Sequence, residues 1–93
     1  MISHTTAQFR KIFTELPADV QRQARRAYRI FHESPNHPSL RFKPVHPTRP
    51  IYPARISSDY RAVGTLDGDE IIWYWIGSHA DYNKLLSQSR RRP

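Results

Sequence analysis

The fold of this 93-residue chain is decided by two β-forming runs joined by an Asp-Gly pair: Tyr60-Arg61-Ala62-Val63-Gly64-Thr65-Leu66, then Asp67-Gly68, then Ile71-Ile72-Trp73-Tyr74-Trp75-Ile76. An Asp-Gly pair between such runs favours a tight β-hairpin with positive φ. The second run is apolar at every position, so it is expected to be a central strand packed on both faces, with Trp73 and Trp75 sharing one of them in the core. Gly77 ends this strand.

Two further strands are expected before the hairpin. Alternation is visible at Tyr52, Ala54 and Ile56, and again at Leu40, Phe42 and Pro44, where the proline favours a sheet edge. Pro-rich turns separate these stretches. The sheet is therefore predicted to be antiparallel, with three or four strands.

Helices are expected on both sides of this sheet region in the sequence. Residues 9–16 carry apolar side chains at helical spacing, and Pro17 breaks the pattern. Residues 18–32 then place Val20, Ala24, Ala27, Tyr28 and Phe31 on one stripe, which completes a helical hairpin. The segment Ser78-His79-Ala80-Asp81 is an S-x-x-D capping box that opens a short last helix. The fold class is therefore α+β, with one domain over 1–87 and a basic, disordered tail over 88–93.

The charge of the chain is positive and concentrated. Fifteen Lys and Arg face eight acids, a net charge of +7, and the whole excess lies in residues 1–61. Most of the basic residues are Arg, which binds phosphate with two parallel hydrogen bonds. This balance indicates a nucleic acid or an acidic protein as partner, although a merely solvated basic surface would look the same.

Other classes of protein fit the sequence poorly. The absence of cysteine rules out disulfides and thiolate zinc sites, and the five histidines have no zinc-like spacing. No apolar run approaches the length of a membrane span, and the N-terminus does not resemble a signal peptide. We therefore expect a cytoplasmic protein without metal, cofactor or membrane contact.

The order of these motifs resembles a known family. A helical hairpin precedes the extended segment Ile51-Tyr52-Pro53-Ala54-Arg55-Ile56-Ser57-Ser58-Asp59-Tyr60-Arg61-Ala62-Val63-Gly64, and the strand after the Asp-Gly pair ends in Trp75-Ile76-Gly77-Ser78-His79-Ala80-Asp81-Tyr82. Over about residues 1–87 the chain resembles the RelE/ParE superfamily of type II toxin–antitoxin toxins. The resemblance implies a cognate antitoxin as partner.

The superfamily divides by activity. RelE-like members are endoribonucleases that cut mRNA in the ribosomal A site by attack of a ribose 2′-hydroxyl on the adjacent phosphate, whereas ParE-like members poison DNA gyrase. The first activity implies the ribosome and mRNA as partners and is the one we favour. A gyrase inhibitor and a non-catalytic relative that only binds its antitoxin or nucleic acid are the alternatives.

The resemblance also implies a catalytic set. Arg61 matches the arginine that contacts the scissile phosphate, Arg55 matches a cation of the preceding strand, and His79 lies where ribonuclease members place Arg or His. Tyr82 matches a C-terminal aromatic residue that stacks on a base. The chain departs from the pattern at Pro53 and Arg55, where some members carry two lysines. Since arginine is a poor general base, His79 is the candidate for proton transfer.

Each of these residues also has a simpler interpretation. Arg61 could pair with Asp59, His79 could only open its helix, with Asp81 as a cap or as its orienting partner, and Tyr82 could pack with Leu85 and Leu86. Nucleic-acid binding is further expected at three basic residues that could instead be solvated charge, namely Arg41, Lys43 and Arg49.

Overall fold

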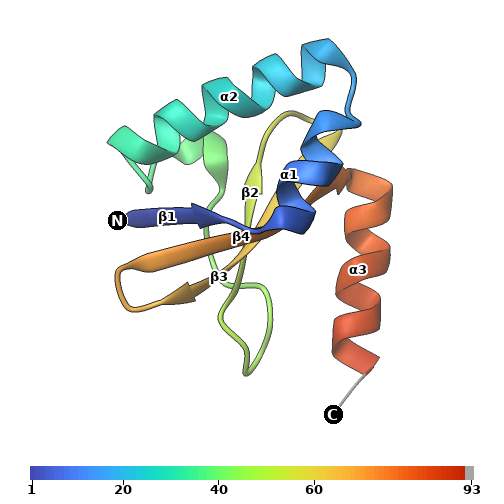
Figure 1. Ribbon diagram of the computed structural model, residues 1–93. Helices are drawn as coiled ribbons and strands as arrows, with labels where there is room; N and C mark the ends of the chain where they lie inside the picture. Colours follow the sequence, from blue (N-terminus) through green and yellow to red (C-terminus); the bar gives the residue numbers. More distant parts are fainter. Residues whose placement is uncertain (92–93) are drawn as a thin grey trace.

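The computed structural model describes residues 1–91, with side chains through residue 88. Within these residues three α-helices and one short 3-10 helix combine with a four-stranded sheet (Figure 1). The elements follow in the order β1 (Ile2–Thr5), α1 (Ala7–Thr14), α2 (Ala18–Glu33), η1 (Pro38–Leu40), β2 (Ile51–Arg55), β3 (Tyr60–Asp67), β4 (Glu70–Ser78) and α3 (His79–Arg91). The predicted α+β class and helical hairpin are confirmed.

The sheet has the strand order β1-β4-β3-β2 and is mixed. Strands β2, β3 and β4 are antiparallel, as expected, but β1 adds a parallel edge strand beside β4. The prediction of a purely antiparallel sheet was therefore wrong. Strand β1 is short and mostly exposed, and its pairing of Ser3 with Ile71 joins distant parts of the sequence.

The β3–β4 hairpin turns at Gly68, as the Asp-Gly pair predicts. Asp67 pairs with Glu70, so Gly68 and Asp69 form the two-residue loop. Gly68 has φ of 59°. Glycine at the first loop position is the pattern of a type II′ turn, whose twist matches that of paired strands.

The strand expected over residues 40–45 is not present, and that prediction was wrong. Leu40 ends η1 and is buried in the core, and Arg41 then takes a left-handed backbone conformation with φ of 49°. The chain next wraps around the β2 edge of the sheet. Phe42 packs in the core under α2, whereas Val45 packs in the core under α3. This wrapping covers an edge strand that would otherwise expose its backbone.

A β-bulge separates the two tryptophans. Val63 pairs with Trp75 and Gly64 with Trp73, so Tyr74 is the extra residue in β4. Because the bulge shifts the alternation of side chains, Trp73 packs in the core under α2 and Trp75 in the core under α3. The expectation that they share one sheet face was therefore wrong.

Two separate cores cover the two faces of the sheet. The larger lies between the sheet and the pair α1–α2, and it contains Ala24, Phe31, Leu40, Trp73 and Ile76 among others. The predicted α2 stripe is buried except for Tyr28, which is 46% exposed. The smaller core lies under α3, around the buried residues Ile51, Val63 and Tyr82.

The last helix is longer than the sequence predicts. Ser78 accepts a hydrogen bond from the Asp81 amide at 3.2 Å, which confirms the helix start. The helix then continues to Arg91, into the segment expected to be a disordered tail. Residues 92 and 93 of that segment lie outside the described residues. No helix in the described part of the chain is long and apolar enough to cross a bilayer.

Candidate active site

The sheet register places Arg55 and Arg61 side by side. They are direct partners across the antiparallel pair β2–β3, next to the turn formed by residues 56–59. On its other side Arg61 faces Gly77 of β4. A Cβ atom at Gly77 would lie 2.6 Å from the Trp75 ring, so only glycine fits there. The position next to Arg61 is thus free of a competing side chain.

One nitrogen of Arg61 holds the turn between β2 and β3. Its Nη1 donates to the carbonyl oxygens of Ser57 at 2.5 Å and Tyr60 at 2.9 Å, with a longer contact to Ser58 at 3.4 Å. Within the described residues Arg61 forms no ion pair with Asp59 and donates no hydrogen bond from Nη2 or Nε. Arg61 is therefore fixed by one end of its guanidinium, while the remaining donors stay available to a ligand.

A third arginine joins this pair. Burial, and then the positive charges of Arg55 and Arg41, lower the pKa of Arg61, and the smaller opposing effects of Tyr82 and Asp59 do not offset them. No ion pair of the described residues neutralises any of the three arginines. The cluster Arg41–Arg55–Arg61 therefore concentrates positive charge that an anion would stabilise.

Arg55 also carries an unsatisfied donor. Its Nε is buried and has no hydrogen-bond partner among the described residues. A buried donor without a partner is destabilising by roughly 1–3 kcal/mol, so such atoms are uncommon.

His79 begins α3 close to this turn. Its backbone amide donates to the Asp59 carbonyl at 2.6 Å, which ties the helix start to the β2–β3 turn. The imidazole is exposed, and its Nδ1 lies 3.3 Å from the Asn83 amide nitrogen. This contact leaves Nε2 open to solvent. Asn83, one helical turn after His79, was not expected in the site. Ser78 caps the helix by accepting from the Asp81 backbone amide.

Tyr82 lies between the arginine cluster and His79. Its ring is only 8% exposed, packs with Ile51 and Val63, and meets the His79 ring edge to face at 5.9 Å. In the structure Tyr82 therefore packs in the core, as its spacing with Leu85 and Leu86 had suggested. A ring buried in this way has no open face on which a base could stack.

The remaining basic candidates are distributed along the loop before β2. Arg41 belongs to the arginine cluster, whereas Lys43 and Arg49 are exposed. The Arg49 charge partly counters the burial that raises the pKa of Tyr74, so Arg49 lies near the sheet face covered by α3. His46 Nδ1 accepts from the amides of Thr48 and Arg49 and shapes this loop. In the described residues no three His, Asp or Glu side chains could hold a metal ion.

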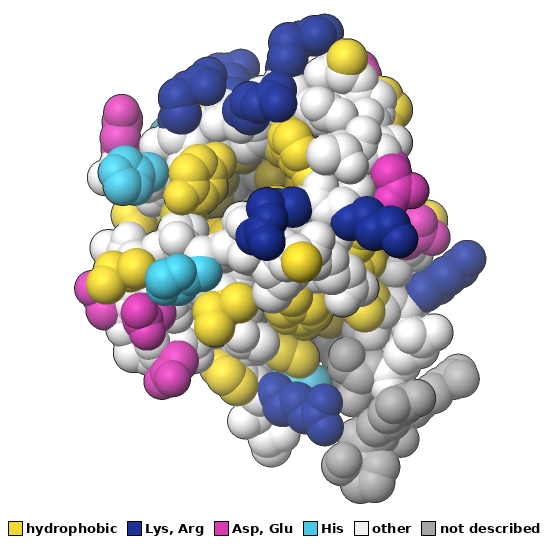
Figure 2. Space-filling model, in the orientation of Figure 1, with side chains coloured by type: hydrophobic (Ala, Val, Ile, Leu, Met, Phe, Trp, Pro, Cys, Tyr) yellow, Lys and Arg dark blue, Asp and Glu magenta, His cyan; other side chains and the backbone are white. Residues whose placement is uncertain are grey.

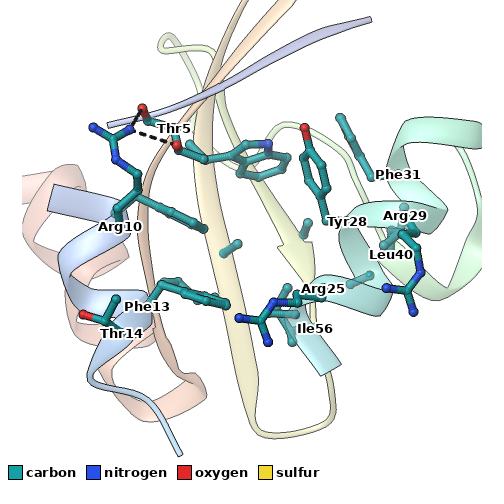
Figure 3. Close-up of a pocket in the computed structure, with 17 residues that line it drawn as sticks. Thr5, Arg10, Phe13, Thr14, Arg25, Tyr28, Arg29, Phe31, Leu40 and Ile56 are labelled. Atoms are coloured by element: carbon teal, nitrogen blue, oxygen red, sulfur yellow. Dashed lines mark hydrogen bonds between the residues drawn. The ribbon is translucent and has the colours of Figure 1, made fainter. Parts of the chain in front are cut away.

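A large apolar groove lies on the opposite face of the sheet, between α1 and α2. It has a volume of about 570 Å³ and a floor of sheet and helix side chains. Figure 2 shows the hollow among hydrophobic side chains, and Figure 3 shows Phe13 of α1 and Arg25 of α2 pointing toward each other across it. Arg10, Arg25 and Arg29 also line the groove, and the part of its lining that the structure describes contains no acidic residue. The groove is suited to an apolar surface with acidic flanks.

Comparison with known proteins identifies the class of this fold. The model of the ParE-like toxin domain matches residues 18–84. No curated protein is similar enough in sequence to match the chain. The chain therefore belongs to the ParE-like toxin domain family and is a toxin of the RelE/ParE superfamily.

Solved structures of toxins share the fold. The RelB–RelE antitoxin–toxin complex of Methanococcus jannaschii matches with a TM-score of 0.71 at 16% identity, covering 88% of this chain and 96% of that chain. YafQ of E. coli matches with a TM-score of 0.67 at 13% identity, covering 86% and 94%. The YoeB/ParE toxin of Agrobacterium tumefaciens matches with a TM-score of 0.67 at 14% identity, covering 85% and 99%.

Proposed function

We propose that this toxin is a ribosome-dependent endoribonuclease that cuts mRNA and is silenced by a cognate antitoxin. The observation that carries the proposal is the arginine cluster Arg41–Arg55–Arg61, in which Arg55 and Arg61 are direct strand partners and no ion pair of the described residues neutralises the charge. Such a cluster is suited to a phosphodiester whose negative charge increases during reaction. A gyrase inhibitor has no need of a site that stabilises a reacting phosphate.

In the proposed reaction the ribose 2′-oxygen attacks the adjacent phosphorus. The new bond joins O2′ to phosphorus, and the bond from phosphorus to O5′ breaks, which leaves a cyclic phosphate and a free 5′-hydroxyl. The proton of the 2′-hydroxyl must leave, and O5′ must gain a proton. Arg55 and Arg61 would stabilise the dianionic phosphorane, because their charges are already in place before the reaction.

His79 is the proposed proton-transfer group. Histidine ordinarily titrates near neutral pH and can therefore accept or donate a proton there. The contact with Tyr82 holds the plane of the ring. The Asn83 amide nitrogen can only donate, so Nδ1 accepts and the neutral ring carries its proton on Nε2, from which it would protonate O5′. We assign Tyr82 to positioning His79 rather than to base stacking, because its ring is buried.

The exposed basic loop would guide the RNA to this site. Arg41 would share the phosphate with Arg55 and Arg61, and the exposed residues Lys43 and Arg49 would contact the flanking backbone. Contacts of this type bind any sequence and weaken as salt rises.

The groove between α1 and α2 is the proposed docking site of the antitoxin. The solved neighbours include the antitoxin complexes RelB–RelE of Methanococcus jannaschii and DinJ–YafQ of E. coli. An apolar floor lined by arginines favours an amphipathic helix with acidic flanks. The groove lies on the sheet face opposite the arginine cluster, so a helix docked in the groove would not itself cover the active site. Other segments of the antitoxin would have to reach that face.

The test is cleavage of a defined mRNA in a reconstituted translation system. Replacing Arg61→Gln should slow cleavage by about 10²–10³-fold, the usual effect of removing one group that stabilises a transition-state charge. Arg22→Gln is the matched control, since Arg22 is exposed on α2 and outside the cluster. Thermal unfolding verifies that the variant is folded, with an expected loss of about 1 kcal/mol from the turn hydrogen bonds. Full cleavage by a folded Arg61→Gln protein would refute the assignment.

A further inference from the structure

A second, more polar pocket lies at the β2 edge of the sheet, between α2, η1 and the turn after β2. It has a volume of about 340 Å³, at the lower end of the range of small-ligand pockets. Arg26 of α2 and Arg55 of β2 line it, and none of the described residues that line it is acidic. The pocket is thus an anion-attracting cavity that shares Arg55 with the arginine cluster.

The walls of this pocket offer two kinds of contact. Gln23, Ser39 and Ser57 supply polar groups, whereas Ala27, Ile30, Leu40 and Ile56 supply apolar surface. Inorganic phosphate would use only the first kind. A nucleotide would use both, because its phosphate can pair with arginine while its base packs on aliphatic side chains and bonds to hydroxyls and amides.

The pocket is also connected to the proposed scissile phosphate. Arg55 is the direct strand partner of Arg61, and Cα atoms of such partners lie roughly 4.5–5.5 Å apart. The Ser57 carbonyl accepts the shortest hydrogen bond of Arg61, so Arg61 fixes the pocket wall. The pocket and the Arg61 guanidinium therefore share the turn between β2 and β3 as a common wall.

We propose that this pocket binds one nucleotide flanking the scissile phosphate, with Arg26 and Arg55 on its phosphate and the aliphatic wall under its base. The role of the pocket in RNA cleavage rests on the proposed ribonuclease function, whereas the binding of a nucleotide in the pocket does not. Arg26 is then a positioning residue, which raises the local concentration of correctly placed RNA without touching the reacting atoms.

The experiment titrates adenosine 5′-monophosphate into the isotopically labelled full chain and follows the backbone amides of Ser39 and Ser57 by NMR. Both signals should shift and saturate. Arg26→Gln should weaken the affinity about tenfold, the effect of one lost charge-assisted contact. Arg22→Gln removes the same charge from an exposed position of the same helix and should change the affinity less than twofold. In the translation assay, Arg26→Gln should raise KM for mRNA and leave kcat unchanged.

Three results of the titration would overturn the pocket assignment. Equal weakening by Arg26→Gln and Arg22→Gln would mean attraction by net charge alone. Inorganic phosphate binding as tightly as the nucleotide would mean a site for small anions, and shifts away from Ser39 and Ser57 would place the nucleotide elsewhere. If the wild type binds the nucleotide through Arg26 but cuts no mRNA, the ribonuclease proposal fails and the pocket stands. If it cuts mRNA and Arg26→Gln changes neither binding nor KM, the pocket fails alone.

Discussion

Replacing Tyr82→Ala separates a packing role for this residue from a role in stacking on RNA. Tyr82 is 8% exposed and completes the small core with Ile51 and Val63. Val63 is completely buried. Truncation of a buried aromatic residue to alanine destabilises proteins by about 3–5 kcal/mol. Because this core is small and lies under one helix, we expect the lower value, about 3 kcal/mol. For a domain of this size that loss lowers Tm by about 12–24 °C.

The assay is thermal unfolding followed by circular dichroism, with Tyr28→Ala as the matched control. Tyr28 is the same residue type but is 46% exposed on α2, so its truncation should change stability by less than about 1 kcal/mol. A Tyr82→Ala protein that unfolds within a few degrees of the wild type, yet no longer cuts RNA, would refute the packing argument. Tyr82 would then have to be accessible to substrate.

Two further predictions concern the bulge and the groove. Gly64→Ala should destabilise the domain by about 1–3 kcal/mol in chemical denaturation, because the added Cβ would lie 2.9 Å from the Ile72 carbonyl oxygen and the backbone cannot move aside. The comparison is Gly68→Ala, where space is open but φ is positive. If Gly64→Ala were as stable as the wild type, the register at the bulge would be contradicted. Tyr28→Glu should leave growth arrest intact but prevent rescue by the co-expressed antitoxin, since it places a charge in the apolar groove; unchanged rescue would exclude the groove as the docking site.

Much of this fold follows from local pattern. The helical spacing in residues 9–16 and 18–32 and the Asp-Gly turn each depend on neighbours in sequence, and each was predicted correctly. Strand β1 could not be predicted in this way, because its four residues become a strand only by pairing with β4. The segment after Leu40 alternates like a strand, but burial of Phe42 and Val45 in different cores requires it to wrap around the edge.

In the candidate site, too, some residues could be predicted from the sequence and others could not. The resemblance to known toxins predicted Arg55, Arg61 and His79 as candidates. The register of β2 and β3 explains why the two arginines are adjacent. Arg41 was expected among the basic residues that bind nucleic acid, but its place near Arg55 and Arg61 depends on the left-handed turn that ends η1, which the sequence did not predict. Asn83 could have been found from its spacing of four residues after His79 on one helix face.

The central claim is tested most directly by induced expression of the wild-type chain in bacteria, with protein synthesis, mRNA integrity and DNA integrity followed together from the first minutes. The ribonuclease account predicts an immediate fall in protein synthesis with cleaved mRNA and intact DNA, and His79→Ala should abolish both changes. Early DNA breaks while protein synthesis continues would contradict the account and assign the chain to the gyrase-poisoning branch of its superfamily.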